Sequence, residues 1–156
     1  MQRFFFLLAA VFAGTLLAYD LSSDQLKMLQ DPGGWEYISL SMNQQNGFPT
    51  QHTCFDGRPH PNECSGTLVF KSDQTFTQSV KIQGKTVQRT GTYQLNGDQL
   101  AFFDELGTQD GPYKLTLNMQ AKSLVLQMPQ SRIELLLESE YRKNRQEGKK
   151  TRASAL

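Results

Sequence analysis

The chain has 156 residues with 16 basic and 15 acidic side chains, and its formal net charge is +1. Outside a basic C-terminal segment the balance is acidic, which argues against a nucleic-acid partner, because nucleic-acid-binding proteins carry a basic surface. The length suits one domain with a buried core of its own. We therefore expect a single domain and a monomer.

The first eighteen residues have the pattern of a secretory signal peptide. One basic residue, Arg3, precedes an uncharged, mainly apolar run at residues 4–17, and the small residue Ala18 follows. A basic start, an apolar stretch and a small residue at the cleavage point are typical of such peptides. A retained membrane anchor is the alternative, but the run is shorter than the ~20 apolar residues that cross a bilayer. We expect residues 1–18 to be removed, leaving a periplasmic or secreted protein without a transmembrane segment.

The folded domain is predicted at residues 19–141, and it begins with a short helix. The stretch SSDQLKMLQD has Ser22 or Ser23 as its cap, and Pro32 followed by two glycines ends it. Beyond it, alternating apolar and polar residues predict eight strands joined by short turns, one of them the hairpin signal Asn96-Gly97. The predicted strands cover residues 35–42, 66–71, 74–82, 86–95, 99–104, 112–119, 123–128 and 132–141.

We predict an all-β fold, an eight-stranded antiparallel up-and-down barrel with a short N-terminal helix. Closing the sheet into a barrel removes its exposed edges, and the short turns join each strand to its neighbour. A β-sandwich is the alternative, although sandwiches usually need longer connections. The segment 142–156 holds six basic residues and one acidic residue without apolar periodicity, so we expect a basic, disordered tail.

The order of these segments resembles the lipocalin-like domains of the calycin superfamily. GGWEYISLS opens the first strand with Gly33 and Trp35, and DGRPHPNECSGTLVFKSDQTFT follows at residues 56–77. These stretches are similar to the Gly-x-Trp start, the DG-x-P stretch and the D-x-T-F hairpin of small bacterial lipocalin-like domains. The resemblance implies that Trp35 closes one end of the barrel beneath a basic residue, for which Arg132 and Arg142 are the candidates.

The interior of an eight-stranded barrel is either filled by side chains or just wide enough for one small ligand. We expect an exported, non-catalytic binding protein for a small hydrophobic molecule, without a cofactor. The alternative is a secreted protein-binding barrel, such as a protease-inhibitor-like module, that engages a protein partner through a loop or the N-terminal segment. The candidate pocket residues are large and predicted to face inward: Tyr37, Phe70, Phe76, Tyr93, Phe102, Tyr113 and Leu115.

The segment QHTCFDGRPHPNEC, at residues 51–64, holds both cysteines and both histidines. His52, Cys54, His60 and Cys64 are residue types that bind zinc, but structural zinc sites usually have more closely spaced cysteine pairs. Two cysteines in an exported domain pair with each other most simply. We predict a Cys54–Cys64 disulfide and exposed histidines, with free thiols and a metal site at the two histidines as the alternatives.

No catalytic arrangement is predicted. Asp56, His60 and Ser65 lie close together in one loop, where nothing in the pattern holds them in the geometry that a nucleophile and its base require. Glu134 and Glu138 share one parity of the last predicted strand, which is typical of a solvated face. We therefore expect the protein not to be an enzyme.

Overall fold

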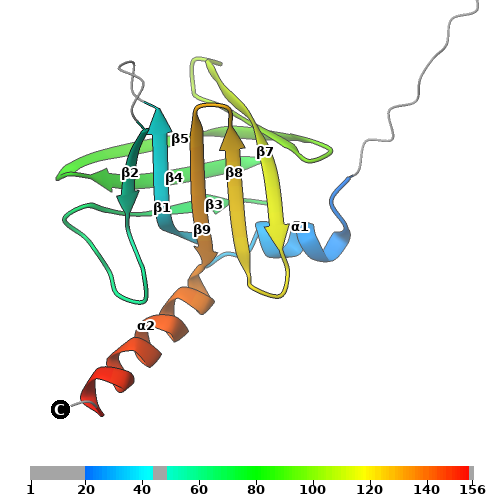
Figure 1. Cartoon of the computed structure of the whole chain (residues 1–156). Helices are drawn as coiled ribbons and strands as arrows, with labels where there is room; N and C mark the ends of the chain where they lie inside the picture. The colour runs from blue at the N-terminus through cyan, green and yellow to red at the C-terminus, as the bar shows by residue number, and fades with distance from the viewer. Residues whose placement is uncertain (1–19, 44–48, 155–156) are drawn as a thin grey trace, which may run out of the picture.

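The computed structural model describes residues 20–43 and 49–154, so the predicted signal peptide lies outside the described residues. Strands dominate, with one helix before them and one after them (Figure 1). The elements are α1 (Ser23–Leu29), β1 (Trp35–Asn43), β2 (Pro49–Thr53), β3 (Cys64–Phe70), β4 (Thr75–Ile82), β5 (Lys85–Asn96), β6 (Gln99–Phe103), β7 (Gln109–Asn118), β8 (Ser123–Met128), β9 (Ser131–Leu137) and α2 (Glu138–Ala153).

Eight of these strands close into an antiparallel barrel. The sheet order runs β1, β3, β4, β5, β6, β7, β8 and β9, and β9 pairs again with β1 from Trp35↔Leu137 to Met42↔Ser131. Every pairing is antiparallel, and consecutive strands from β3 to β9 are neighbours. The predicted fold class is therefore confirmed, and pairing of the first strand with the last excludes the sandwich.

The strand β2 is the strand that the sequence pattern does not predict. It pairs with the C-terminal part of β1, from Ser39↔Thr53 to Asn43↔Pro49. The strand β3 pairs with β1 only at Trp35 and Glu36. One edge of β1 is thus shared between two partners. The sequence PTQHT has no apolar alternation, so it carries no strand signal.

Helix α1 begins as its cap residue predicts. Ser22 Oγ accepts a hydrogen bond from the backbone N–H of Gln25 at 3.2 Å, and Gln25 Oε1 accepts one from the backbone N–H of Ser22 at 2.8 Å. This reciprocal pair is a capping box, which satisfies two donors at the start of a helix. After the helix, Gly34 has φ +72°, and a Cβ there would approach Val69 Cγ2 to 2.7 Å. Gly34 therefore allows the turn into β1 and its close packing on β3.

The C-terminal segment is a helix, which corrects the prediction of a disordered tail. The last strand ends at Leu137 rather than at residue 141, and α2 extends to Ala153. Glu138 forms an ion pair with Arg142, and Glu140 forms one with Lys143 at 3.5 Å. Such pairs three or four residues apart stabilise a helix, and acidic residues in the first turn interact favourably with the helix dipole. Helix α2 lacks the apolar periodicity by which amphipathic helices are recognised in a sequence, so the sequence pattern does not predict it.

Candidate binding site

The seven predicted pocket residues form the packed core of the barrel. All are buried, and they belong to one cluster with the apolar residues of the other strands. The ring centroid of Phe102 lies 4.7 Å from that of Phe76, 5.8 Å from that of Tyr113 and 5.9 Å from that of Phe70. Phe70 also meets Tyr93 edge-on at 5.1 Å. Tyr37 and Leu115 complete the set. A ligand among these rings would have to displace them.

A polar network lies within the barrel beside this aromatic cluster. Arg89 Nη1 donates to Asp110 Oδ2 at 2.6 Å, and it lies 3.4 Å from Gln78 Oε1. The Tyr113 hydroxyl donates to Asp110 Oδ1 at 2.8 Å, and Gln78 Nε2 donates to the Tyr37 hydroxyl. The network thus ties β1, β4, β5 and β7 together. Because its buried groups are hydrogen-bonded, it avoids the cost of unpaired polar atoms.

The two phenols of this network are held in the neutral form. Burial raises the pKa of Tyr37 to about 12, although the hydrogen bond from Gln78 opposes the change. Burial also raises the pKa of Tyr113 well above its ordinary value, and the hydrogen bond to Asp110 adds to the increase. A neutral phenol can donate its proton to Asp110, which an ionised one cannot. The arrangement is therefore a hydrogen-bonded network in which the neutral Tyr113 hydroxyl donates to Asp110.

Trp35 closes the α1 end of the barrel, but neither predicted basic residue covers it. The indole is fully buried, and its Nε1 donates to the backbone oxygen of Leu29 at 2.9 Å. Arg132 pairs in register with Ser41, six residues farther along β1, and its side chain contacts Glu134 and Gln127. Arg142 is largely exposed and pairs with Glu138. Helix α1, rather than a basic side chain, therefore lies against the indole of Trp35.

Gly33, the first residue of the Gly-x-Trp stretch, lies in the turn before β1. Its backbone N–H donates to Asp31 Oδ1 at 2.9 Å in the turn before β1. A Cβ there would meet Asp31 Oδ1 at 3.1 Å and Glu138 Oε2 at 3.4 Å, and the residue does not have a positive φ. Gly33 therefore belongs to the turn that leads into the Trp35 strand, whereas Gly34 supplies the unusual backbone conformation.

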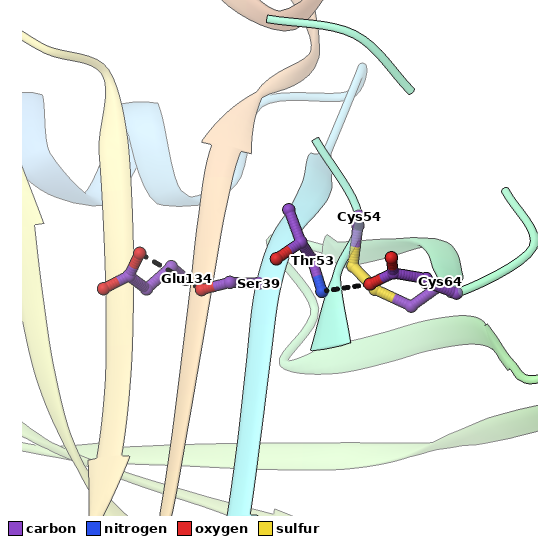
Figure 2. The surroundings of a disulfide bond; sticks show 6 residues. Ser39, Thr53, Cys54, Cys64 and Glu134 are labelled. Carbon is purple, nitrogen blue, oxygen red and sulfur yellow. Dashed lines mark hydrogen bonds between the residues drawn. A yellow bond between two sulfur atoms is a disulfide. The ribbon is translucent and has the colours of Figure 1, made fainter. Parts of the chain in front are cut away.

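The Cys54–Cys64 disulfide is present, with the two Cα atoms 4.6 Å apart (Figure 2). It joins the residue after β2 to the first residue of β3. Backbone N–H groups of Cys54 and Phe55 both donate to the oxygen of Ile38, so the segment after β2 stays on β1. The Thr53 N–H donates to Glu63 Oε2 at 3.2 Å. The bridge therefore fixes the loop at residues 54–64, which we call the disulfide loop.

The histidines differ from their prediction and from each other. His52 is buried, which corrects the expectation of an exposed side chain; it lies on β2, which the sequence pattern does not predict. His60 is partly exposed, and its Nε2 lies 2.8 Å from Asp56 Oδ1. The disulfide removes both sulfurs from the zinc-ligand set. Within residues 20–43 and 49–154, no three His, Cys, Asp or Glu side chains group closely enough to hold a metal ion.

An apolar groove lies on the outside of the barrel, beside the disulfide loop and α2. Its volume is about 360 Å³. The side chains of Ile38, Val125 and Leu136 supply its wall, because they lie on β1, β8 and β9 with the opposite parity to the core residues. Phe55 of the disulfide loop and Asn144 of α2 border it. We call this the outer groove.

Two contacts hold α2 beside the disulfide loop and so fix one border of the outer groove. The rings of Phe55 and Tyr141 lie 4.6 Å apart between centroids. Farther along α2, a Cβ at Gly148 would lie 2.6 Å from the backbone oxygen of Gly57. Glycine in a helix costs about 1 kcal/mol relative to alanine. The close approach to the loop explains why a glycine stands at this position.

A family model described as a lipocalin-like domain matches residues 33–126. The chain belongs to this family of lipocalin-like domains. Comparisons with curated proteins and with solved structures gave no match. The barrel supports placing this lipocalin-like domain among binding proteins. Neither α1 nor α2, the helices of the described chain, is long and apolar enough to cross a membrane.

The core of this lipocalin-like domain can be predicted from the sequence, but its outer groove cannot. The inward residues are large and alternate regularly, and this pattern makes them the pocket candidates. The groove residues Ile38, Val125 and Leu136 are single apolar residues on the outer faces of three separate strands. They come together only because β1, β9 and β8 are neighbours in the closed sheet. The one feature of the sequence that could have indicated the groove is the presence of apolar residues at strand positions predicted to face solvent.

Proposed function

We propose that this lipocalin-like domain is an exported, non-catalytic binding protein, and that its ligand is a small hydrophobic molecule held in the outer groove. The observation that carries the proposal is the apolar groove of about 360 Å³ bordered by Phe55 and Asn144. Sites for small molecules commonly have volumes of 300–1,000 Å³ and are mostly apolar with a few polar groups. Here Asn144, Ser123 and Glu134 supply polar groups to the lining.

The barrel interior supports this location over the one expected from the sequence. The seven interior candidates pack against one another and are almost inaccessible. The polar network of Arg89, Asp110 and Gln78 adds satisfied groups that an apolar ligand would have to disrupt. In contrast, the outer groove already exposes apolar surface. A hydrophobic ligand would bury this apolar surface, and each Å² removed from water would stabilise the complex by roughly 25 cal/mol.

Export is supported by two independent features. The disulfide between Cys54 and Cys64 is of a kind that persists in oxidising compartments. The N-terminal segment has the signal-peptide pattern described above. Intact mass spectrometry of protein recovered from the periplasm or the medium tests the proposal. We expect a mass that corresponds to loss of residues 1–18, and a mass that retains them would contradict cleavage.

Binding is tested with the mature protein and Nile red, a neutral lipophilic dye whose fluorescence rises in apolar surroundings. We expect saturable binding that Val125→Lys abolishes, because a charged group would then occupy the wall of the groove. Val87→Lys is the matched control, since Val87 is half-exposed on β5 and does not line the outer groove. Native mass spectrometry of the protein as purified gives a second readout for a bound molecule.

Three outcomes distinguish the proposals. Loss of dye binding in Val125→Lys alone supports the outer groove. Equal loss in Val87→Lys and Val125→Lys would show that the dye does not bind in the groove. Absence of saturable binding by the native protein, together with no bound molecule in native mass spectrometry, would remove the small-ligand function.

A protein partner is the second candidate function, and β2 is the observation that favours it. In the described sheet β2 pairs with β1 on one side and stands at the end of the strand order. An edge strand can accept an additional strand from another protein through main-chain hydrogen bonds. Capture of a specific protein from the same compartment by the native chain, lost on Gln51→Pro, would support this function. Capture that persists in Gln51→Pro would exclude β2 as the contact.

A further inference from the structure

A second pocket lies where the disulfide loop meets α2, and it is basic. Its volume is about 140 Å³, and its lining comes from two elements only. Arg58 contributes from the loop, and Arg145 and Lys149 contribute from the helix; Gly57, Pro59 and Gly148 form the rest. We call it the basic pocket. It is separate in lining from the outer groove, with which it shares no residue.

The basic side chains of the pocket differ from neighbouring basic residues of α2, which form ion pairs with glutamates of the same helix. Arg142 pairs with Glu138, and Lys143 pairs with Glu140. Within the described residues, no ion pair within 4 Å engages Arg145 or Lys149. Arg58 has only an exposed contact with Asp56 at 3.6 Å, and Asp56 also holds His60 at 2.8 Å. Three basic residues therefore line one pocket with one shared carboxylate nearby.

The geometry that brings these cations together is fixed by packing. The disulfide and the contact of Phe55 with Tyr141 hold the loop and the helix side by side. The contact between Gly148 and the Gly57 oxygen brings the two backbones close enough for Arg58 to share a pocket with Lys149. Basic side chains that line one pocket repel one another, and an anion bound among them would lower that repulsion. A pre-formed site of this kind favours an external anion.

We propose that the basic pocket binds a phosphate group. A phosphate presents several strong acceptor oxygens, which suits two planar guanidinium groups and one ammonium group better than the two oxygens of a carboxylate. The phosphate belongs either to a soluble phosphate ester or to a lipid headgroup, and the chemistry of the pocket is the same for both. This inference does not depend on the hydrophobic ligand proposed for the outer groove.

The test measures binding of inorganic phosphate to the mature protein by isothermal titration calorimetry, with chloride at matched ionic strength in the reference. We expect Arg145→Gln and Lys149→Gln each to weaken binding about tenfold, because each removes a hydrogen bond between charged groups. Lys150→Gln is the matched control. It removes the same charge one residue away, on a side chain that does not line the pocket. Circular dichroism confirms that each variant retains its fold.

A second arm identifies the source of the phosphate. Sedimentation is measured with vesicles of neutral phosphatidylcholine and with the same vesicles containing phosphatidic acid. Selective binding to the phosphatidic acid vesicles, lost in Lys149→Gln and retained in Lys150→Gln, supports a lipid headgroup. Binding of inorganic phosphate with the same pattern, and no vesicle binding, supports a soluble ester. Equal effects of Lys149→Gln and Lys150→Gln in both arms, or no binding beyond that of chloride, would overturn the site.

Discussion

The indole Nε1 of Trp35 donates a hydrogen bond to the backbone oxygen of Leu29 across 2.9 Å, and both side chains are completely buried. Leu29 is the last residue of α1. The final carbonyl groups of a helix have no partner within the helix, and they need one from elsewhere when they are buried. The tryptophan therefore does two things at once. It fills the end of the barrel, and it attaches the helix that covers that end.

We expect Trp35→Phe to destabilise the protein by about 2–3 kcal/mol. The phenylalanine ring keeps part of the packing but cannot donate, so the Leu29 oxygen is left buried without its partner. Urea denaturation followed by circular dichroism measures the change. Val87→Ala, at a half-exposed position, is the control and is expected to have a much smaller effect. A stability for Trp35→Phe equal to that of the native protein would show that the hydrogen bond is unimportant.

Removing the disulfide is expected to cost roughly 3 kcal/mol. In the chain-entropy model a cross-link over a loop of this length, ten residues in sequence separation, stabilises by about that amount. The double variant Cys54→Ala/Cys64→Ala is compared with the native protein in urea. Because the loop also borders α2, the variant should lose Nile red binding before it unfolds. Unchanged stability together with unchanged dye binding would contradict a structural role for the bridge.

Tyr37 predicts an alkaline limit to stability. Its folded-state pKa is raised to about 12 from an ordinary value of 10, so its ionisation is easier in the unfolded chain. The resulting stability is fully present below pH 10 and is lost as the pH rises toward 12. Urea midpoints at pH 8, 10 and 12 measure the loss. Tyr37→Phe should remove part of this pH dependence, and an equally steep decline in the variant would refute the assignment to Tyr37.

Gly148→Ala is expected to destabilise the contact between α2 and the disulfide loop, although the same change usually stabilises a helix. The added Cβ would lie 2.6 Å from the Gly57 oxygen, which is a backbone atom and cannot rotate away. Thermal unfolding is compared with that of Gln146→Ala, an exposed position on α2 where only helix propensity changes. A melting temperature for Gly148→Ala at or above that of Gln146→Ala would mean that the helix does not approach the loop this closely.

The barrel could be predicted because its physical cause is local in the sequence. Leu115 and Leu117 on β7 face Leu126 and Leu124 on β8, as their alternation requires. The positions of the turns are also predictable, but the exact ends of the strands are not. Where the prediction extended β7 to Met119, the Asn118 side chain instead accepts from the N–H groups of the two residues after Met119 and ends the strand. Such a cap depends on one side-chain rotamer, which apolar periodicity does not report.

The candidate sites could not be predicted, because each depends on chance neighbours in space. The basic pocket needs Arg58 and Lys149, which are far apart in the chain and meet only because α2 packs on the disulfide loop. That packing needs α2 to be a helix, and its charged sequence suggested disorder instead. The interior candidates were correctly placed inside the barrel. Whether large side chains enclose a space or fill it depends on their fit, which the sequence does not contain.

The divided edge of β1 has a mechanical consequence. Around most of the cylinder, long hydrogen-bonded ladders resist separation of the strands, as in the eight residue pairs between β4 and β5. Between β1 and β3 the ladder has two pairs, Trp35↔Leu68 and Glu36↔Thr67. Beyond these pairs β2 replaces β3 along β1, and the disulfide between the two cysteines of the chain links the end of β2 to β3. The seam with the fewest ladder contacts is thus the one reinforced by a bond that heat and denaturant do not break.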